Sequence, residues 1–306
     1  MRKFLSLLIL VTVALIGGCG VTTCERSEIA MGTVITLKAT GSNAQAAVEE
    51  SFTQIAELEK NISADVRKIE EASGTGEAVK ISPEVYEILE IAQKYSELTD
   101  GAFDVTCGAA VELWGIGTKN PRIPTEDELA AVKNFVGHEH LHLHDGTAYL
   151  DLRGVKLNPG GVAKGYGVDL VGKIFAAHGI HDGLIDFGNS TIFAVGKKKI
   201  GIKNPDDPGK IAEIVELENC AISTSGDYEK FFIVEGHRYS HIIDPKTCMP
   251  VNSAISSISV VVSNEVKKCA TVADILSTTS FVIGRCRAEE ILRRHSHARF
   301  LTPLSD

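Results

Sequence analysis

The sequence lacks several features that would assign it to a simple functional class. Its 31 basic residues are outnumbered by 40 acidic ones, so a formal net charge of −9 argues against nucleic acid as a partner. Its seven cysteines form no CxxC pair and have no Cys/His spacing suited to zinc. No internal repeat occurs, and both common glycine-rich phosphate patterns, GxGxxG and GxxxxGK[ST], are missing.

The composition is that of a folded protein. The 306 residues are 44% hydrophobic and 23% charged, which is too apolar for a disordered chain. This length allows one large domain or two domains of ~150 residues, with a sizeable buried core. An anionic ligand would need a local lysine, a helix N-terminus or a metal ion to offset the acidic balance.

The N-terminus predicts an export signal. Arg2 and Lys3 precede an apolar stretch, Phe4–Ile16, that is too short to span a ~30 Å hydrocarbon core as a helix. The following Gly17-Gly18-Cys19 resembles a bacterial lipobox, in which the cysteine is lipidated after cleavage. An ordinary signal peptide and an uncleaved anchor are the alternatives.

With a lipoprotein export signal, the chain is expected to have three parts. Residues 1–18 are a lipoprotein signal peptide, 19–27 a tether that begins at the lipidated Cys19, and 28–306 the folded domain. Loss of Arg2 and Lys3 makes the mature net charge −11. We expect a bacterial membrane lipoprotein that faces the periplasm or the cell exterior, on the outer membrane if the cell has one.

The order of helical and strand patterns predicts an α+β or α/β domain. Apolar residues at intervals of three and four indicate helices, and alternation indicates strands. The expected helices are Asn43–Ile62, one from Pro83 to before Gly101, one opened by a Thr125–Glu128 capping box, Val162–His178 and Ala270–Ile283; the expected strands are Gly32–Ala39, Gly183–Phe187, Thr191–Val195, Lys199–Ile202, a hairpin of Phe231–Val234 with Tyr239–Ile243, Ser257–Val262 and Arg299–Leu301.

A glycine-rich turn precedes one of these helices. In Asn158–Tyr166, glycines leave the first N–H groups of the helix free to approach an anion, and Lys164 adds a positive charge. Such a turn can hold a diphosphate. A plain loop-to-helix connection explains the same residues equally well.

Two further segments contain polar residues in apolar surroundings. His241 is a candidate general base or a core histidine with satisfied hydrogen bonds. Asp274 and Thr278 lie four residues apart on one helix face, which suits a hard cation such as Mg2+, unless Asp274 pairs with a Lys or Arg. The alternating His138, His140, His142 and His144 favour a solvated strand near a turn over a metal-binding tract.

These segments together resemble the ApbE family of flavin transferases, which cleave FAD and attach FMN to a Ser or Thr of another exported protein. The residues that carry the resemblance run in family order through most of the chain: Met31-Gly32-Thr33, Gly101–Thr106, Leu113-Trp114-Gly115, Gly161–Tyr166, Ser223–Tyr228, His241–Pro245 and Ala273–Thr278. The resemblance implies an α+β fold of mixed, T-fold-related sheets with flanking helices and an FAD site in the cleft between the two halves.

The resemblance also implies roles for individual residues. The carbonyl of Gly161, with Asp274 and Thr278, would hold Mg2+, and His241 would take the proton of the acceptor hydroxyl. Cys248 stands where the family pattern has glycine, which implies a backbone with positive φ there. The residues expected to bind FAD are Met31, Ala102, Phe103, Asp104, Asn158, Lys164, Asp227 and Ile242.

The expected activity is therefore that of a Mg2+-dependent FAD:protein FMN transferase. The alternatives are an FAD diphosphatase that yields FMN and AMP, and a non-catalytic FAD-binding lipoprotein. The acceptor motif Asp-x-x-Ser/Thr-Gly-Ala-Ser/Thr is absent from the chain, which favours the donor enzyme over the modified target.

Overall fold

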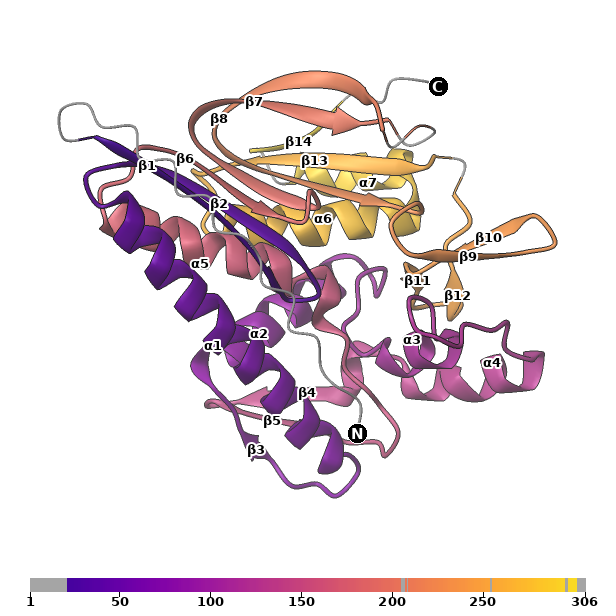
Figure 1. Ribbon diagram of the computed structural model, residues 1–306. Helices are drawn as coiled ribbons and strands as arrows, with labels where there is room; N and C mark the ends of the chain where they lie inside the picture. The colour runs from indigo at the N-terminus through magenta and orange to yellow at the C-terminus, as the bar shows by residue number, and fades with distance from the viewer. Residues whose placement is uncertain (1–20, 205–206, 208, 254, 295–296, 302–306) are drawn as a thin grey trace, which may run out of the picture.

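A seven-stranded sheet organises the chain (Figure 1), and every neighbouring pair of strands in it is antiparallel. The structure is a computed structural model and describes residues 21–204, 207, 209–253, 255–294 and 297–301. In sheet order, the strands are β1 (Thr22–Ala30), β2 (Thr33–Gly41), β6 (Asp182–Phe187), β7 (Thr191–Lys203), β8 (Ile211–Gly226), β13 (Ser257–Ser263) and β14 (Ala298–Phe300).

The expected signal peptide, residues 1–18, and the lipidation site Cys19 lie outside the described residues. Residues 22–27, which the sequence assigns to the tether, belong to β1, so the sheet includes residues before the expected domain start at 28. No side chain of this edge strand is fully buried, and its polar sequence therefore shows no hydrophobic alternation. Among the described residues, no helix is long and apolar enough to cross a membrane.

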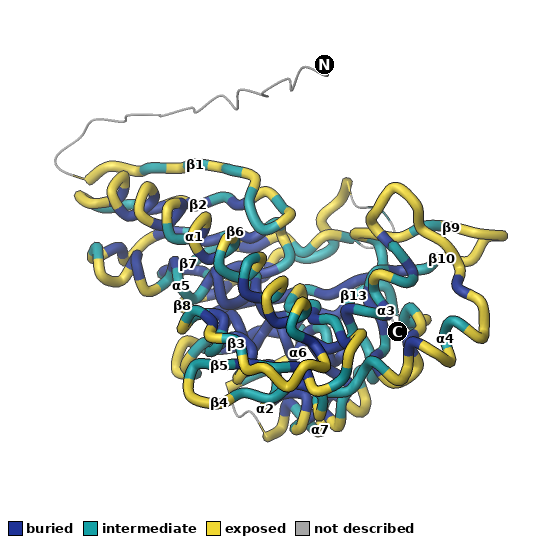
Figure 2. Tube along the Cα trace, turned by 90° about the horizontal axis from the view of Figure 1, so that it is seen from below, coloured by how far each residue is buried: buried dark blue, intermediate teal, exposed yellow. Residues whose placement is uncertain are grey.

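Three helices cover one face of the sheet: α1 (Ala44–Glu71), α5 (Ala163–Ala177) and α6 (Cys269–Ile283) (Figure 1). The apolar faces of these helices and strands form the main core, and buried segments gather between α6 and the sheet in Figure 2. Helices α5 and α6 approach closely at Gly165, where a Cβ atom would lie 2.4 Å from the carbonyl oxygen of Ala270. Only glycine permits this approach.

Smaller elements complete a mixed α+β fold, which confirms the predicted fold class. They are a three-stranded sheet of β3 (Val79–Lys80), β5 (Thr147–Leu150) and β4 (Leu141–His144), helices α2 (Pro83–Leu98), α3 (Gly108–Trp114), α4 (Glu126–Val132) and α7 (Arg285–Arg293), and the strand pairs β9 (Phe231–Val234) with β10 (His237–Ser240) and β11 (Ile243–Asp244) with β12 (Met249–Pro250).

Several element boundaries differ from those expected. Helix α1 continues to Glu71 because further buried positions, among them Ile69, extend its apolar face beyond Ile62. The two strands expected at 191–195 and 199–202 are one strand, β7, whose bulge includes Gly196 at φ 69°. In the hairpin, the second strand ends at Ser240, and Ile243 belongs to β11.

The histidine tract does not form one strand. Residues 138–140 make a 3₁₀ turn, and only His142 and His144 lie in β4. His140 Nδ1 and His142 Nε2 lie 2.8 and 3.1 Å from the carboxylate oxygens of Asp151. The six described cysteines are all free thiols: Cys220, Cys248 and Cys269 are buried, Cys24 and Cys107 are half-buried, and Cys286 is exposed.

Candidate functional site

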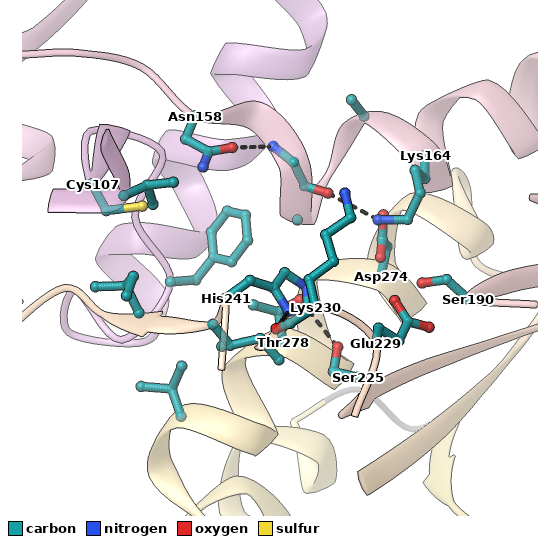
Figure 3. Close-up of a pocket in the computed structure, with 18 of the residues that line it drawn as sticks. Cys107, Asn158, Lys164, Ser190, Ser225, Glu229, Lys230, His241, Asp274 and Thr278 are labelled. Carbon is teal, nitrogen blue, oxygen red and sulfur yellow. Dashed lines mark hydrogen bonds between the residues drawn. The ribbon is translucent and has the colours of Figure 1, made fainter. Parts of the chain in front are cut away.

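A cavity of about 370 Å3 lies where the β1–β2 turn, the loop after α2, the start of α5, the end of β8 and helix α6 converge (Figure 3). It brings together residues that are far apart in the sequence. Apart from Asp227, every described residue that the sequence assigns to the site lines it: Met31, Ala102, Phe103, Asp104, Asn158, Gly161, Lys164, His241, Ile242, Asp274 and Thr278.

A tight turn positions Met31 at this cavity. Ala30 pairs with Thr33 across the hairpin, so Met31 and Gly32 are the two central residues of the turn. Both have positive φ, 50° and 72°, as a two-residue hairpin turn requires. For methionine this backbone costs about 1–2 kcal/mol, which the packing of the hairpin must offset.

A buried carboxylate shapes the loop after α2. Asp104 accepts hydrogen bonds from the backbone N–H and the hydroxyl of Thr106, at 2.8 and 2.7 Å. Burial raises the pKa of Asp104, while the bonds from Thr106 and the nearby His138 act in the opposite direction. The bonds to Thr106 fix the loop that presents Phe103 to the cavity.

The glycine-rich turn is held by its own side chains. Asn158 Oδ1 accepts a hydrogen bond from Gly160 N at 2.9 Å, and Lys164 Nζ donates to the Gly160 carbonyl at 3.1 Å. Lys164 also lies on the first turn of α5, where the free N–H groups and the helix dipole favour an anion. The turn therefore places two sources of positive potential at the cavity wall.

Oxygen atoms from two elements meet opposite this turn. Asp274 on α6 is 2% exposed and accepts hydrogen bonds from Gly165 N at 2.9 Å and Ser223 Oγ at 3.3 Å. One helical turn later, Thr278 Oγ1 lies 3.3 Å from Ser225 Oγ. A Cβ at Gly161 would lie 3.4 Å from Thr278 Oγ1 and 3.0 Å from the Phe103 ring, so glycine keeps this space open.

This donor set suits a hard divalent cation. Within the described ranges, no Lys or Arg forms an ion pair with Asp274, so the expected alternative of a salt bridge does not account for its buried charge. Carboxylate, hydroxyl and carbonyl oxygens are typical ligands of such cations. No group of three or more His, Cys, Asp or Glu suited to a metal occurs among the described residues, so a cation here would rely on this mixed set.

His241 follows β10 and is held by one carbonyl. Its backbone N–H donates to Lys230 O at 3.0 Å, and its ring Nδ1 lies 3.2 Å from the same oxygen. Because a carbonyl only accepts, this contact assigns the ring proton to Nδ1 and leaves the lone pair on Nε2. Partial burial, followed by the positive charge of Lys164, lowers the pKa of His241 to about 4. The imidazole is therefore neutral near pH 7.

Sequence reasoning did not select Glu229 and Lys230, although both line the cavity and point into it in Figure 3. Glu229 also lines a second, smaller cavity of about 200 Å3 beside the first. Both residues directly follow the Ser223–Tyr228 motif, and this adjacency was the available signal. Asp227 instead forms an ion pair with Arg238 at 3.0 Å, and it does not line the cavity.

The arrangement combines an oxygen set for a divalent cation, a helix N-terminus with a lysine for an anion, and a neutral imidazole. These are the parts of a site for metal-assisted transfer of a phosphate-bearing group. A sequence profile of the ApbE family matches residues 31–301, and the chain belongs to this family.

Curated relatives agree with this membership. The chain is 31% identical over 313 residues to the FAD:protein FMN transferase of Treponema pallidum (strain Nichols), an alignment that covers 91% of this chain and 84% of the relative. It is 34% identical over 221 residues to the FAD:protein FMN transferase of Vibrio cholerae, with 70% of this chain and 65% of that protein covered.

Solved structures share the fold. The ApbE protein of Thermotoga maritima aligns with a TM-score of 0.81 and 28% identity, covering 92% of this chain and 94% of its own. The flavin transferase ApbE of Vibrio cholerae aligns with a TM-score of 0.78 and 26% identity, over 92% and 93% of the two chains. The family-based expectation of mixed sheets with flanking helices is confirmed.

Proposed function

We propose that the protein is a Mg2+-dependent FAD:protein FMN transferase, which cleaves the diphosphate of FAD and attaches FMN through a phosphoester to Ser or Thr of an exported acceptor protein. The main support is the meeting of Asp274, Thr278, Gly161 and His241 in one cavity. The curated relatives that carry this activity in their names point to the same reaction.

In this proposal, each part of the cavity has a separate task. The Gly161 carbonyl, the Asp274 carboxylate and the Thr278 hydroxyl would hold Mg2+, which supplies positive charge to the diphosphate when bound. Lys164 and the N-terminus of α5 bind the phosphate oxygens. Phe103 and Ile242 contribute apolar walls, and Met31 closes the cavity beside the β1–β2 turn.

His241 is the candidate base. Its neutral imidazole accepts the proton of the acceptor hydroxyl at Nε2, while Nδ1 stays bonded to the Lys230 carbonyl. The bond between the hydroxyl oxygen and the FMN phosphorus forms as the bond from this phosphorus to the AMP oxygen breaks. The products are the flavinylated acceptor and AMP, with the proton held on His241.

An assay with purified protein, FAD, Mg2+ and an acceptor domain that carries the family acceptor motif tests this function. Flavin bound to the acceptor, together with released AMP, is the expected result. Free FMN with AMP and an unmodified acceptor would identify an FAD diphosphatase. Intact FAD would leave only the flavin-binding lipoprotein and would refute both enzymatic activities.

The location of the protein is a separate proposal. The lipobox-like Gly17-Gly18-Cys19 supports an exported lipoprotein anchored through Cys19. Membrane fractionation of the full chain, compared with a Cys19→Ala variant, tests it. We expect the wild type in the membrane fraction, and equal partition of the two proteins would contradict lipidation at this residue.

A further inference from the structure

The β9–β10 hairpin carries two exposed apolar side chains on one face. Phe231 and Ile233 alternate along β9 and point to the same face; they are 40% and 59% exposed. Val234, the last residue of β9, and Met249 on β12 are also exposed. The hairpin projects from the body of the structure in Figure 1, and β9 is exposed along most of its length in Figure 2.

The opposite face holds the hairpin on the protein. Phe232 stacks on Tyr239 with ring centroids 5.1 Å apart, and Tyr239 stacks on the buried Trp114 at 5.5 Å. On the exposed side, the guanidinium of Arg238 lies over the Phe231 ring at 4.8 Å and pairs with Asp227. These contacts fix the hairpin, so its exposed apolar residues form a preorganised surface.

Both ends of the hairpin lead directly into the site. Lys230 precedes β9, His241 follows β10, and both line the cavity. The Lys230 carbonyl is also the group that orients the His241 ring. A partner that binds the base of the hairpin therefore lies close to the candidate base.

We propose that the exposed face of Phe231 and Ile233 is the surface on which the acceptor protein docks, through an apolar side chain near the hydroxyl that receives FMN. This inference rests on the proposed transferase function, in which a protein segment must reach the mouth of the cavity. An exposed apolar patch beside such a mouth is suited to that contact.

The geometry limits which acceptor residue can contact the exposed face of Phe231 and Ile233. Ile233 is three residues along β9 from Lys230, a span of about 10 Å at the rise of an extended chain. An extended acceptor segment covers the same span in three residues. The surface therefore suits an apolar acceptor side chain that lies about 10 Å from the modified hydroxyl.

The test compares Ile233→Ser with Ile214→Ser in the full chain. Ile214 on β8 is 64% exposed and lines neither cavity, so it controls for loss of an exposed isoleucine. With FAD, Mg2+ and an acceptor domain that carries the family motif, we expect Ile233→Ser to raise the acceptor KM about tenfold. The Kd for FAD should not change, and Ile214→Ser should behave as wild type.

Two negative results have different meanings. If the wild type transfers flavin and Ile233→Ser has an unchanged acceptor KM, or if both variants lose activity equally, the docking surface is refuted and the transferase function stands. If the wild type transfers no flavin to the acceptor, the proposed function fails, and the docking proposal fails with it.

Discussion

Replacing Asp274 with Asn removes the charge of the candidate cation site with little change in shape. The Asn oxygen can still accept the hydrogen bond from Gly165 N, and the Ser223 hydroxyl can rotate to accept from the new amide. We therefore expect the metal-free free energy of unfolding to change by no more than ~1 kcal/mol. In Asp274→Ala the Gly165 N–H loses its partner, which costs about 1–3 kcal/mol.

The wild type and Asp274→Asn should differ in thermal stability when Mg2+ is added. A ligand at 100 times its Kd stabilises the folded state by about 2.7 kcal/mol. For a chain of about 300 residues, with an unfolding entropy of about 0.6 kcal/mol/K, that corresponds to a rise in Tm of about 4–5 °C. We expect this rise in the wild type and no rise in Asp274→Asn, because a neutral amide is a poor ligand for a hard cation.

Thermal unfolding with and without Mg2+ measures this difference, with turnover of FAD measured in parallel. Asp227→Asn is the matched control, since Asp227 pairs with Arg238 outside the cavity and should leave the response to Mg2+ intact. A full Mg2+-dependent shift and full activity in Asp274→Asn would refute the assignment of this carboxylate as a ligand.

His241→Gln should lower kcat by about 10²–10⁴-fold with little change in FAD affinity; an unchanged kcat would exclude His241 as the base. Burial and the positive charge of Lys164 lower the pKa of His241 to about 4, so the imidazole stays neutral from pH 7 to pH 5. We therefore expect kcat/KM to fall only near pH 4, and a fall centred at pH 6.5 would contradict this assignment. Gly165→Ala should destabilise the fold by about 1–3 kcal/mol or more, since its Cβ would meet Ala270 O at 2.4 Å. The control Gly172→Ala has open space around its Cβ and should be neutral or stabilising. Equal unfolding midpoints for the two variants would refute the close α5–α6 contact.

The pKa of His241 also affects stability, in a direction that can be derived. The unfolded chain binds a proton at this histidine below its usual pKa of 6.5, whereas the folded chain binds it only below about 4. Its contribution to stability is therefore lost as the pH falls from 6.5 to 4, and is constant above 6.5. Loss of this dependence in His241→Gln, measured by denaturant unfolding across that range, is the expected result.

Two candidate site residues were recognisable from a local pattern in the sequence. Asp274 and Thr278 interrupt an apolar helix at a spacing of four, and the structure places both at the cavity. The spacing of Asp274 and Thr278 was informative because side chains four residues apart lie on one face of a helix. The positive φ of Cys248, 57°, was instead implied by the resemblance to the ApbE family, whose pattern has glycine there; its carbonyl accepts the indole N–H of Trp114 at 2.8 Å.

Features that depend on distant pairing were missed. The polar edge strand β1 carries no hydrophobic alternation, and it is defined by its pairing with β2. Asp227 was expected in the FAD site, but Arg238 across the hairpin pairs with it outside the cavity. Glu229 and Lys230 lie at the cavity because the chain passes it between β8 and the hairpin. No periodicity in the sequence indicates this position.

The most direct test of the central claim is the product balance of one reaction that contains the protein, FAD, Mg2+ and an acceptor domain with the family motif. We expect one AMP released for each FMN bound to a Ser or Thr of the acceptor, with both products absent from Asp274→Asn and strongly reduced in His241→Gln. AMP released with free FMN and no modified acceptor would contradict it.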